Sequence, residues 1–458
     1  MNSKIKPLFK FLWAILLFSL PILNLPAQDY RPFIESQYKK QTYAPGSSDL
    51  SQGYSFIGMY KEALLEEEKN GIPSEFQLVK SDVDKKLHAE NAYPFIYEAI
   101  RKNKIVVMNE AHNIPLTRVT LYTMIDNLKK LGVDALFLEA LQYSATDSIY
   151  RNFNPENGMG YYAVENVFRQ VMYKLKQAGI PLYSYEEEFE RLDTATIQGK
   201  KYFISKKDKQ WIPIPTDDYL LANYVSPHDF YNREVEQALK IYQKLLRNKI
   251  NKALIFCGYD HGRREGNNMI DNLEHLLKKR VFAIDQVLLN ERINRNLEDT
   301  LYTQFATASY PFVIVNHQKK PLHTLRSITK STITDSLCDL FIGSPRSNYI
   351  QNRPTWLELN GYRKRYPLSQ FMDTTQLYSD FLVCVYRAEV MQTKKDYYIP
   401  DDVFQVLGNG KEYDLLLDPH TNYQLKIIKD GQLIIDKPIP RRIVRCATVN
   451  EKNESSGF

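Results

Sequence analysis

Short apolar runs alternate with amphipathic stretches from about residue 86 onward. Leu121, Ile125 and Leu128 recur at helical spacing, and Gly132 follows where a helix commonly ends. The runs themselves cover residues 104–108, 135–138, 181–185, 253–257, 281–284 and 311–315. This alternation predicts an α/β domain over residues 86–395, with a mainly parallel sheet flanked by helices.

The same arrangement of helix, turn and strand recurs further along the chain. Val167, Val171 and Leu175 form an apolar stripe, Gly179 closes that helix, and the next strand begins at Ile180. A further helix is expected over residues 233–246, before the apolar run at 253–257.

The two ends of the chain show other patterns. Residues 28–85 combine polar and turn-forming stretches with a helical patch at 59–69, and they are expected to form an N-terminal extension. After residue 395 short β runs take over, and Asp430-Gly431 between runs 425–429 and 432–435 predicts a hairpin. Residues 396–458 are therefore expected to form a small β-rich C-terminal appendage and tail.

The first residues have the pattern of a targeting segment. Lys4, Lys6 and Lys10 precede a nearly continuous apolar run at 11–23, and Ala27 is a small residue suited to cleavage. This predicts a signal peptide over residues 1–27 and an exported protein, periplasmic or secreted. An uncleaved anchor is the alternative. No second apolar segment of spanning length follows, so no membrane span is expected after cleavage.

Charge and cysteine content narrow the function classes. Removing the three lysines of the leader from the formal charge of +6 leaves +3, which is too mild to indicate nucleic-acid binding. The four cysteines, Cys257, Cys338, Cys384 and Cys446, form no CxxC pair. Cys257 lies inside an apolar run and is expected to be a buried free thiol.

Acidic residues and histidines follow four of the predicted strands. Ligands of open α/β sheets bind beyond the carboxyl ends of the strands, so these side chains are expected to share one edge. Solvated loops carry polar residues in any case, but the repetition over four strands favours a site. The residues are Glu110 and His112, then Glu139, then Glu186 to Glu188, and then His261.

The first of these strand ends is the most informative. Glu110 and His112 are separated by one residue, so an extended backbone would point both side chains to the same side. Asn113-Ile114-Pro115 then predicts the start of a helix whose N-terminus would favour an anion, and Arg118 would add a positive charge. The predicted substrate-binding residues are Arg118, Glu187, Arg233 and Tyr259.

Two segments resemble a known superfamily. The first runs from Val106-Val107-Met108-Asn109-Glu110-Ala111-His112 to Leu136-Phe137-Leu138-Glu139, and the second is Leu254-Ile255-Phe256-Cys257-Gly258-Tyr259-Asp260-His261. Both are similar to the GExH…LE and GxxH motifs of the ChaN/Tiki/erythromycin-esterase superfamily. The similarity covers roughly residues 90–290 and extends to Tyr185-Glu186 and Arg233-Glu234.

The resemblance implies an α/β fold with a cleft that contains Glu110, His112, Glu139 and His261. It also implies the activities of the superfamily, whose members hydrolyse esters or peptides or bind haem. The chain departs from the motif at Asn109, where glycine is usual. Its Glu-x-His spacing resembles the ChaN/Tiki branch, which speaks against macrolide esterase activity in particular.

These observations favour a hydrolase that cleaves an ester or amide bond of a small molecule or peptide. A carboxylate or His112 would activate water, and His261 or Arg118 would stabilise the developing charge. A divalent metal held by Glu110, His112 and His261 would be a further aid, although no HExxH helix is present. The GxSxG and Walker motifs are also absent.

Two alternatives without catalysis stay open. One is a haem- or metal-binding protein of the ChaN type, with Tyr259 as an axial ligand of the haem iron, although no CxxCH attachment motif is present. The other is a protein that retains the fold alone.

Overall fold

The computed structural model describes residues 48–69, 76–79, 86–141, 162, 165–186, 192–206, 211–224, 232–327, 333–334, 337–391 and 400–441. These residues fall into two compact units. One comprises those within Met1–Lys69, Asn154–Gln170 and Ser347–Phe458, and the other those within Asn70–Phe153 and Val171–Arg346.

The expected signal peptide lies outside the described residues. Over the part of the chain that the structure describes, no helix is long and apolar enough to cross a membrane.

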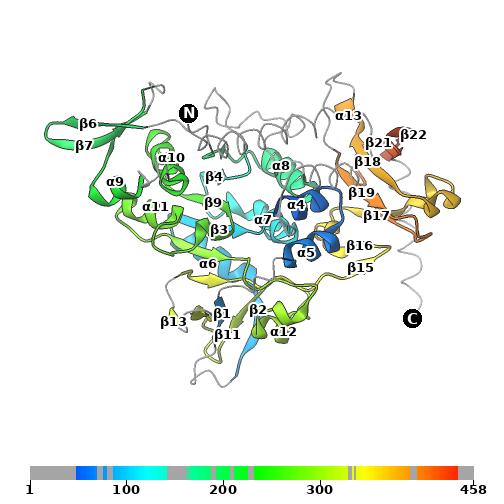
Figure 1. Cartoon of the computed structure of the whole chain (residues 1–458), viewed down its shortest axis with the longest axis horizontal. Coiled ribbons are helices and arrows are strands. Elements are labelled where there is room, and N and C mark those ends of the chain that lie inside the picture. The colour runs from blue at the N-terminus through cyan, green and yellow to red at the C-terminus, as the bar shows by residue number, and fades with distance from the viewer. Residues whose placement is uncertain are drawn as a thin grey trace, which may run out of the picture. The chain divides into compact units, whose positions relative to one another are not determined.

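A six-stranded, all-parallel sheet forms the centre of the second unit, and it confirms the α/β fold (Figure 1). The order of its strands is β14-β10-β3-β9-β4-β5. The strands are β3 (Ile105–Glu110), β4 (Ala135–Leu138), β5 (Leu182–Tyr183), β9 (Ala253–Gly258), β10 (Phe282–Asp285) and β14 (Leu340–Phe341).

The sixth predicted run does not belong to this sheet. Residues Phe312–Val315 form β11, which pairs antiparallel with β2 (His88–Asn91). The two-residue strand β14 is the sixth strand of the parallel sheet and lies at the end next to β10. The correction has a simple physical reason: a short apolar run shows that a strand is buried, but it does not show its partner or its direction.

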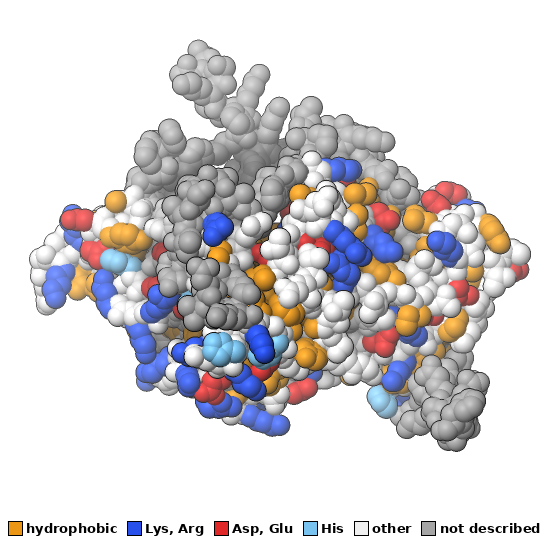
Figure 2. Space-filling model, turned by 90° about the horizontal axis from the view of Figure 1, so that it is seen from below, with side chains coloured by type: hydrophobic (Ala, Val, Ile, Leu, Met, Phe, Trp, Pro, Cys, Tyr) orange, Lys and Arg blue, Asp and Glu red, His pale blue; other side chains and the backbone are white. Residues whose placement is uncertain are grey.

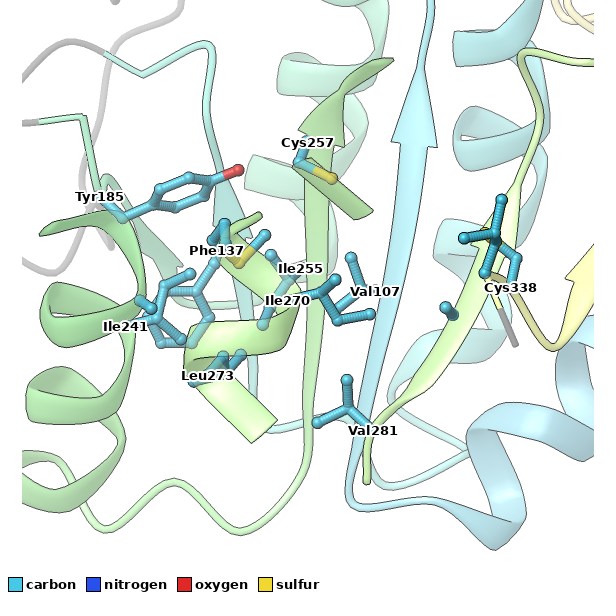
Figure 3. Packing of buried hydrophobic residues seen from close by; sticks show 14 of the residues in the cluster. Val107, Phe137, Tyr185, Ile241, Ile255, Cys257, Ile270, Leu273, Val281 and Cys338 are labelled. Carbon is cyan, nitrogen blue, oxygen red and sulfur yellow. The ribbon is translucent and has the colours of Figure 1, made fainter. Parts of the chain in front are cut away.

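Helices cover both faces of the parallel sheet. Right-handed crossovers place α7 (Leu116–Leu128) and α8 (Asn166–Ala178) on one face, and α10 (Arg233–Arg247) and α11 (Met269–Leu277) on the other. Figure 3 shows the second of these faces. There Val107, Phe137 and Ile255 of the strands pack with Ile241 of α10 and Ile270 of α11.

The connections of two neighbouring central strands run to opposite faces of the sheet. The chain leaves β3 for a helix on one face, and it leaves the neighbouring β9 for a helix on the other. Ligands of doubly wound sheets usually bind beyond the carboxyl ends of such strands, so the carboxyl ends of β3 and β9 are where a site is expected.

Shorter elements complete the second unit. They are β1 (Phe76–Leu78), α6 (Ala92–Lys102), β6 (Asp193–Ile197), β7 (Lys200–Ile204), β8 (Ile214–Pro215), α9 (Asp218–Tyr224), η3 (Tyr259–Gly262), η4 (Arg295–Leu297), α12 (Thr300–Phe305), β12 (Leu325–Ser327) and β13 (Ile333–Thr334).

The other unit contains the C-terminal β structure. Its four-stranded antiparallel sheet has the order β19-β18-β21-β22, with β18 (Phe381–Arg387), β19 (Asp402–Val406), β21 (Tyr423–Lys429) and β22 (Gln432–Ile439). The predicted hairpin is confirmed: Asp430 and Gly431 connect β21 to β22 with φ of 49° and 76°.

Further elements of this unit are α4 (Ser48–Phe56), α5 (Tyr60–Glu68), β15 (Tyr349–Ile350), β16 (Arg353–Pro354), η5 (Thr355–Glu358), β17 (Lys364–Pro367), η6 (Leu368–Gln370), η7 (Thr374–Tyr378), α13 (Ala388–Met391) and β20 (Asp414–Leu417). The C-terminal part of this unit runs from Ser347 onward, so it contains residues before 396 as well as the expected β-rich appendage. The reason is that β18, a strand in the interior of the sheet, pairs with β19 and β21, which come later in the chain.

A buried ionic cluster links the segments of this unit. Asp402 accepts hydrogen bonds from Arg353 (2.7 Å), Asn166 (2.8 Å) and the Leu416 amide (2.8 Å). Arg363 donates to the side-chain oxygen of Asn166 at 3.0 Å. The first turn of α8 is thus held by residues of the C-terminal β structure.

Both units contain fully buried arginines. Arg118, Arg169, Arg353 and Arg363 are among the largest fully buried side chains. On the face that Figure 2 presents, by contrast, basic and acidic side chains are interspersed.

Three cysteines lie in the described part of the chain. Cys257, Cys338 and Cys384 are buried free thiols, which confirms the expectation for Cys257. Burial raises the pKa of each of these thiols above the usual value. Cys446 lies outside the described residues.

Candidate functional site

The structure brings the four predicted catalytic residues together. Glu110 ends β3, Glu139 follows β4, and His261 lies in the η3 turn directly after β9. Because β9 pairs with β3 on one side and with β4 on the other, the three strand ends are adjacent. All of these residues belong to one compact unit.

Glu110 and His112 form a hydrogen-bonded pair that Arg118 supports. The Nδ1 atom of His112 lies 2.8 Å from Glu110 Oε1. Arg118 donates from Nε to Glu110 Oε2 at 2.5 Å and from Nη2 to the His112 carbonyl at 3.0 Å. Arg118 lies in the first turn of α7, the helix that follows β3, and its positive charge therefore lies at the carboxyl end of that strand.

The charges of this group reinforce one another. Burial by itself would raise the pKa of Glu110, but Arg118 and His112 outweigh it and hold that pKa below its usual value. Burial likewise opposes a charge on His112, but Glu110 and Glu139 raise the pKa of the imidazole above its usual value. Glu110 is therefore a fixed anion that keeps a proton on Nδ1 of His112.

Gly258 lets His112 approach the end of β9. A Cβ atom at position 258 would lie 2.2 Å from His112 Nε2, so no other residue fits there without displacing the imidazole. The Gly258 amide also donates to Glu139 Oε2 at 2.5 Å. The ring of the adjacent Tyr259 meets the His112 ring edge-on, with ring centroids 5.5 Å apart. The Tyr259 hydroxyl donates a hydrogen bond to Asn113 Oδ1 at 2.5 Å.

Glu139 lies between the two imidazoles. Its Oε1 atom is 3.8 Å from His112 Nε2 and 3.4 Å from His261 Nε2. The same oxygen accepts a hydrogen bond from Arg233 Nη2 at 2.8 Å. Burial would raise the pKa of Glu139, but the neighbouring histidines lower it well below the usual value.

His261 repeats the arrangement of His112. Its Nδ1 atom lies 2.7 Å from Glu234 Oε1, while Glu234 Oε2 accepts from the Met269 amide at the start of α11. Burial lowers the pKa of His261, but Glu139 and Glu234 outweigh this effect and raise it to about 10. Each imidazole thus has a glutamate at Nδ1 and faces Glu139 with Nε2.

Arg233 forms the more open side of the site. Its side chain is 43% exposed and bonds to Glu186 at 2.6 Å as well as to Glu139. Its Nη1 atom lies 3.2 Å from His261 Nε2. Gln237, one turn further along α10, donates to the same carboxylate oxygen of Glu186.

The predicted substrate-binding residues have different positions. Arg233 and Tyr259 border the site, and Glu187 lies outside the described residues. Arg118 is fully buried and bonds to Glu110, so it positions the site and is not open to a ligand. The helix expected to start at Asn113 begins at Leu116, and Asn113 accepts from Tyr259.

Sequence reasoning did not assign a role to Glu234. The sequence shows only that Glu234 follows Arg233 at the predicted start of a helix. Its role depends on the first turn of α10 lying against η3, and that proximity is decided by tertiary structure.

The carboxylates of Glu110 and Glu139 and the Nδ1 atoms of both histidines are already paired within the protein. Among the described residues there is no group of three or more His, Cys, Asp or Glu side chains arranged to hold a metal ion. Glu110 and Glu139 are paired with arginines, and both Nδ1 atoms face glutamates. This set fits a hydrogen-bonded acid–base network better than a coordination shell.

The raised pKa of His261 gives a pH-dependent prediction. A group with a folded-state pKa of about 10 and an ordinary value of 6.5 stabilises the fold fully below pH 6.5, and that contribution is lost as the pH rises through about 10. Glu234→Gln removes one of the two carboxylates and should lower the pKa of His261, so the loss should begin at lower pH. NMR titration of the imidazole resonances measures this change. An unaltered titration curve would contradict the assigned role of Glu234.

Comparisons with known proteins add little. No family model and no curated protein matches the chain. Among solved structures, the chain is similar to "The structure of the type III effector HopBA1", with 13% identity and a TM-score of 0.26. The match covers 45% of this chain and 89% of that chain. A TM-score of this size is too low to bear on fold or function.

Proposed function

We propose that the chain is an exported hydrolase that cleaves an ester or amide bond in a small molecule or peptide. One observation carries the proposal: two imidazoles, each bonded through Nδ1 to a glutamate, direct Nε2 toward the same oxygen of Glu139. A histidine oriented by a carboxylate is a recurring device for moving protons during hydrolysis.

His112 is suited to act as the general base. Glu110 holds the hydrogen on Nδ1, so Nε2 is the nitrogen that loses its proton when the ring becomes neutral, and its lone pair can then take a proton from the attacking water. Because the pKa of His112 is raised above its usual value, the neutral form should increase as the pH rises above that usual value. The fixed charge of Glu110 then stabilises the imidazolium that forms. Glu139 is a poor base, because its pKa lies well below the usual value.

His261 is suited to act as the general acid. With a pKa of about 10, it is protonated at neutral pH and can give its Nε2 proton to the leaving group. Arg233 can then donate from Nη1, at 3.2 Å, to the Nε2 atom that has lost its proton. The half-exposed guanidinium of Arg233 also offers stabilisation to a developing oxyanion.

Two features of the sequence support the same proposal. The motifs around Glu110, Glu139 and His261 resemble those of the ChaN/Tiki/erythromycin-esterase superfamily, which includes hydrolases of esters and peptides. The basic and apolar leader at residues 1–27 is typical of export.

A panel of ester and peptide substrates tests the proposal. Replacing His261 with asparagine should lower turnover about 100-fold, the effect of losing a general acid. Because the ion pairs of His261 with Glu139 and Glu234 are lost as well, the melting temperature should fall, and turnover is compared at a temperature where circular dichroism shows the variant to be folded. The matched control is His275→Asn, which removes another carboxylate-paired histidine, bonded to Asp217 at 2.7 Å. The control should keep full turnover.

The other outcomes separate the alternatives. Equal turnover of the two histidine variants would refute the acid role of His261. Turnover that is lost with a chelator and restored by a divalent cation would favour the metal-assisted form of the reaction. A saturable shift of the haemin Soret band, without turnover of any substrate, would favour haem binding of the ChaN type.

A further inference from the structure

A second hydrogen-bonded network lies beside the site and includes none of the proposed catalytic side chains. Asn109 is fully buried at the end of β3. Its Nδ2 atom donates to the Tyr259 carbonyl at 2.7 Å and to Asp285 Oδ2 at 2.8 Å. Its Oδ1 atom accepts from the Gln286 amide at 2.8 Å. One side-chain amide therefore joins the carboxyl ends of β3, β9 and β10.

The turn that Asn109 holds is the one that presents His261. Tyr259, the first residue of η3, has φ of +27°, a value that side-chain-bearing residues rarely adopt. Such a conformation persists only where the surroundings enforce it. Because Tyr259 is two residues before His261, its backbone conformation determines where the imidazole lies.

Arg263 and Asp285 close this network into a ring. Arg263 donates from Nη1 to Asp260 Oδ1 at 2.7 Å and from Nε to Asp285 Oδ2 at 2.8 Å. The same Asp285 oxygen accepts from Asn109, and Asp285 is buried. The ring thus runs from Asn109 through Asp285, Arg263 and Asp260 to Tyr259, and back to Asn109.

We propose that Asn109 is a positioning residue: through this ring it fixes the η3 turn and holds His261 at Glu139. The Asn109 side chain reaches the turn that carries His261 through the backbone carbonyl of Tyr259 and makes no hydrogen bond to Glu110, Glu139 or His261 in the described structure. The inference rests on the proposed function in one respect, which is the role of His261 as a reacting group. The position of His261 can be measured without any substrate.

Asn109→Ala tests the proposal. The expected result is a folded protein in which His261 leaves Glu139, so that diethyl pyrocarbonate modifies His261 several-fold faster than in the wild type. Peptide mass spectrometry gives that rate relative to the exposed His323 in the same sample. A crystal structure of the variant should show the His261 Nε2 to Glu139 Oε1 distance lengthened beyond 3.4 Å.

A matched control separates positioning from stability. Asn166 is also a fully buried asparagine with two side-chain partners, Asp402 and Arg363, but it belongs to the other compact unit. Asn166→Ala should lower the melting temperature and leave the modification rate of His261 unchanged. A folded Asn109→Ala protein that gives this same pattern would overturn the proposal.

A milder variant serves if Asn109→Ala does not fold. Arg263→Lys keeps a positive charge beside Asp285 but lacks the second arm that reaches Asp260. It should raise the modification rate of His261 in the same direction, by a smaller factor, and an unchanged rate would count against the ring. Faster modification together with no turnover of any substrate by the wild type would uphold the positioning role and refute the hydrolase.

Discussion

Replacing Arg118 with methionine should lower the free energy of unfolding by about 3–5 kcal/mol, which is the usual cost of leaving a buried charge without its partner. Arg118 has no exposed surface, and it contacts both carboxylate oxygens of Glu110. Methionine has a similar volume, but it removes the positive charge and the two hydrogen bonds that stabilise the buried carboxylate of Glu110. Urea unfolding at pH 7 measures the difference.

A second substitution identifies the source of that loss. Glu110→Gln in the Arg118→Met background removes the uncompensated carboxylate and should recover part of the stability. The pKa of Glu110 is lowered in the folded state, so its contribution is present above the ordinary value of 4.5 and is lost as the pH falls. The difference in the free energy of unfolding between the wild type and Arg118→Met should therefore become smaller as the pH is lowered. A double variant no more stable than Arg118→Met would assign the loss to packing.

Gly258→Ala should lower turnover by about 1000-fold, within the range attributed to general acid–base catalysis. The backbone at Gly258 is extended, with φ of −80° and ψ of 154°, so alanine brings no conformational strain. Its Cβ would lie 2.2 Å from His112 Nε2, and the imidazole must move away from Glu139. Substrate assays give the loss of turnover, and a crystal structure gives the displacement of His112.

Gly262→Ala is the control for this prediction. A Cβ there would meet Val107 and Cys257 at 3.2 and 3.3 Å, which is a tight contact with apolar side chains and not with an imidazole. Gly262→Ala should lower the free energy of unfolding by about 1–3 kcal/mol, the usual cost of overpacking, and should keep most of the turnover. Equal losses of turnover in the two glycine variants would contradict the special role of Gly258.

Glu110 bonds to both His112 and Arg118, so its replacement tests the hydrolase less clearly than replacement of His261. Glu110→Gln by itself would impair His112 and would also leave Arg118 without its carboxylate, so lost turnover could reflect lost stability. His261 is the better choice, because its side chain is 15% exposed and its removal leaves Glu139 bonded to Arg233 and to the Gly258 amide.

The sequence by itself determined the α/β class and the edge of the sheet at which the site lies. Five of the six predicted runs are strands of the parallel sheet, because buried parallel strands appear as short apolar runs between amphipathic helices. Glu110, Glu139 and His261 could be found because each stands at or just beyond the carboxyl end of such a strand. The spacing of Glu110 and His112 predicted side chains on the same side of an extended backbone; the strand ends at Glu110, and the two side chains nevertheless form a hydrogen bond.

Tertiary structure alone decided which side chains the site residues contact. Arg118 was expected to meet a ligand, but the geometry of α7 turns it toward Glu110 and buries it. Asn109 stood out in the sequence only as a departure from a motif, and its role depends on the ends of β9 and β10 lying beside it.

Glu234 shows the same limit, since its contact with His261 depends on how α10 packs against η3. The position of β11 and the segments that complete the C-terminal unit were also set by pairing between distant parts of the chain. The physical reason is common to all of them. Periodicity along a sequence shows which side of an element is buried, whereas hydrogen bonds between elements depend on packing that no local pattern encodes.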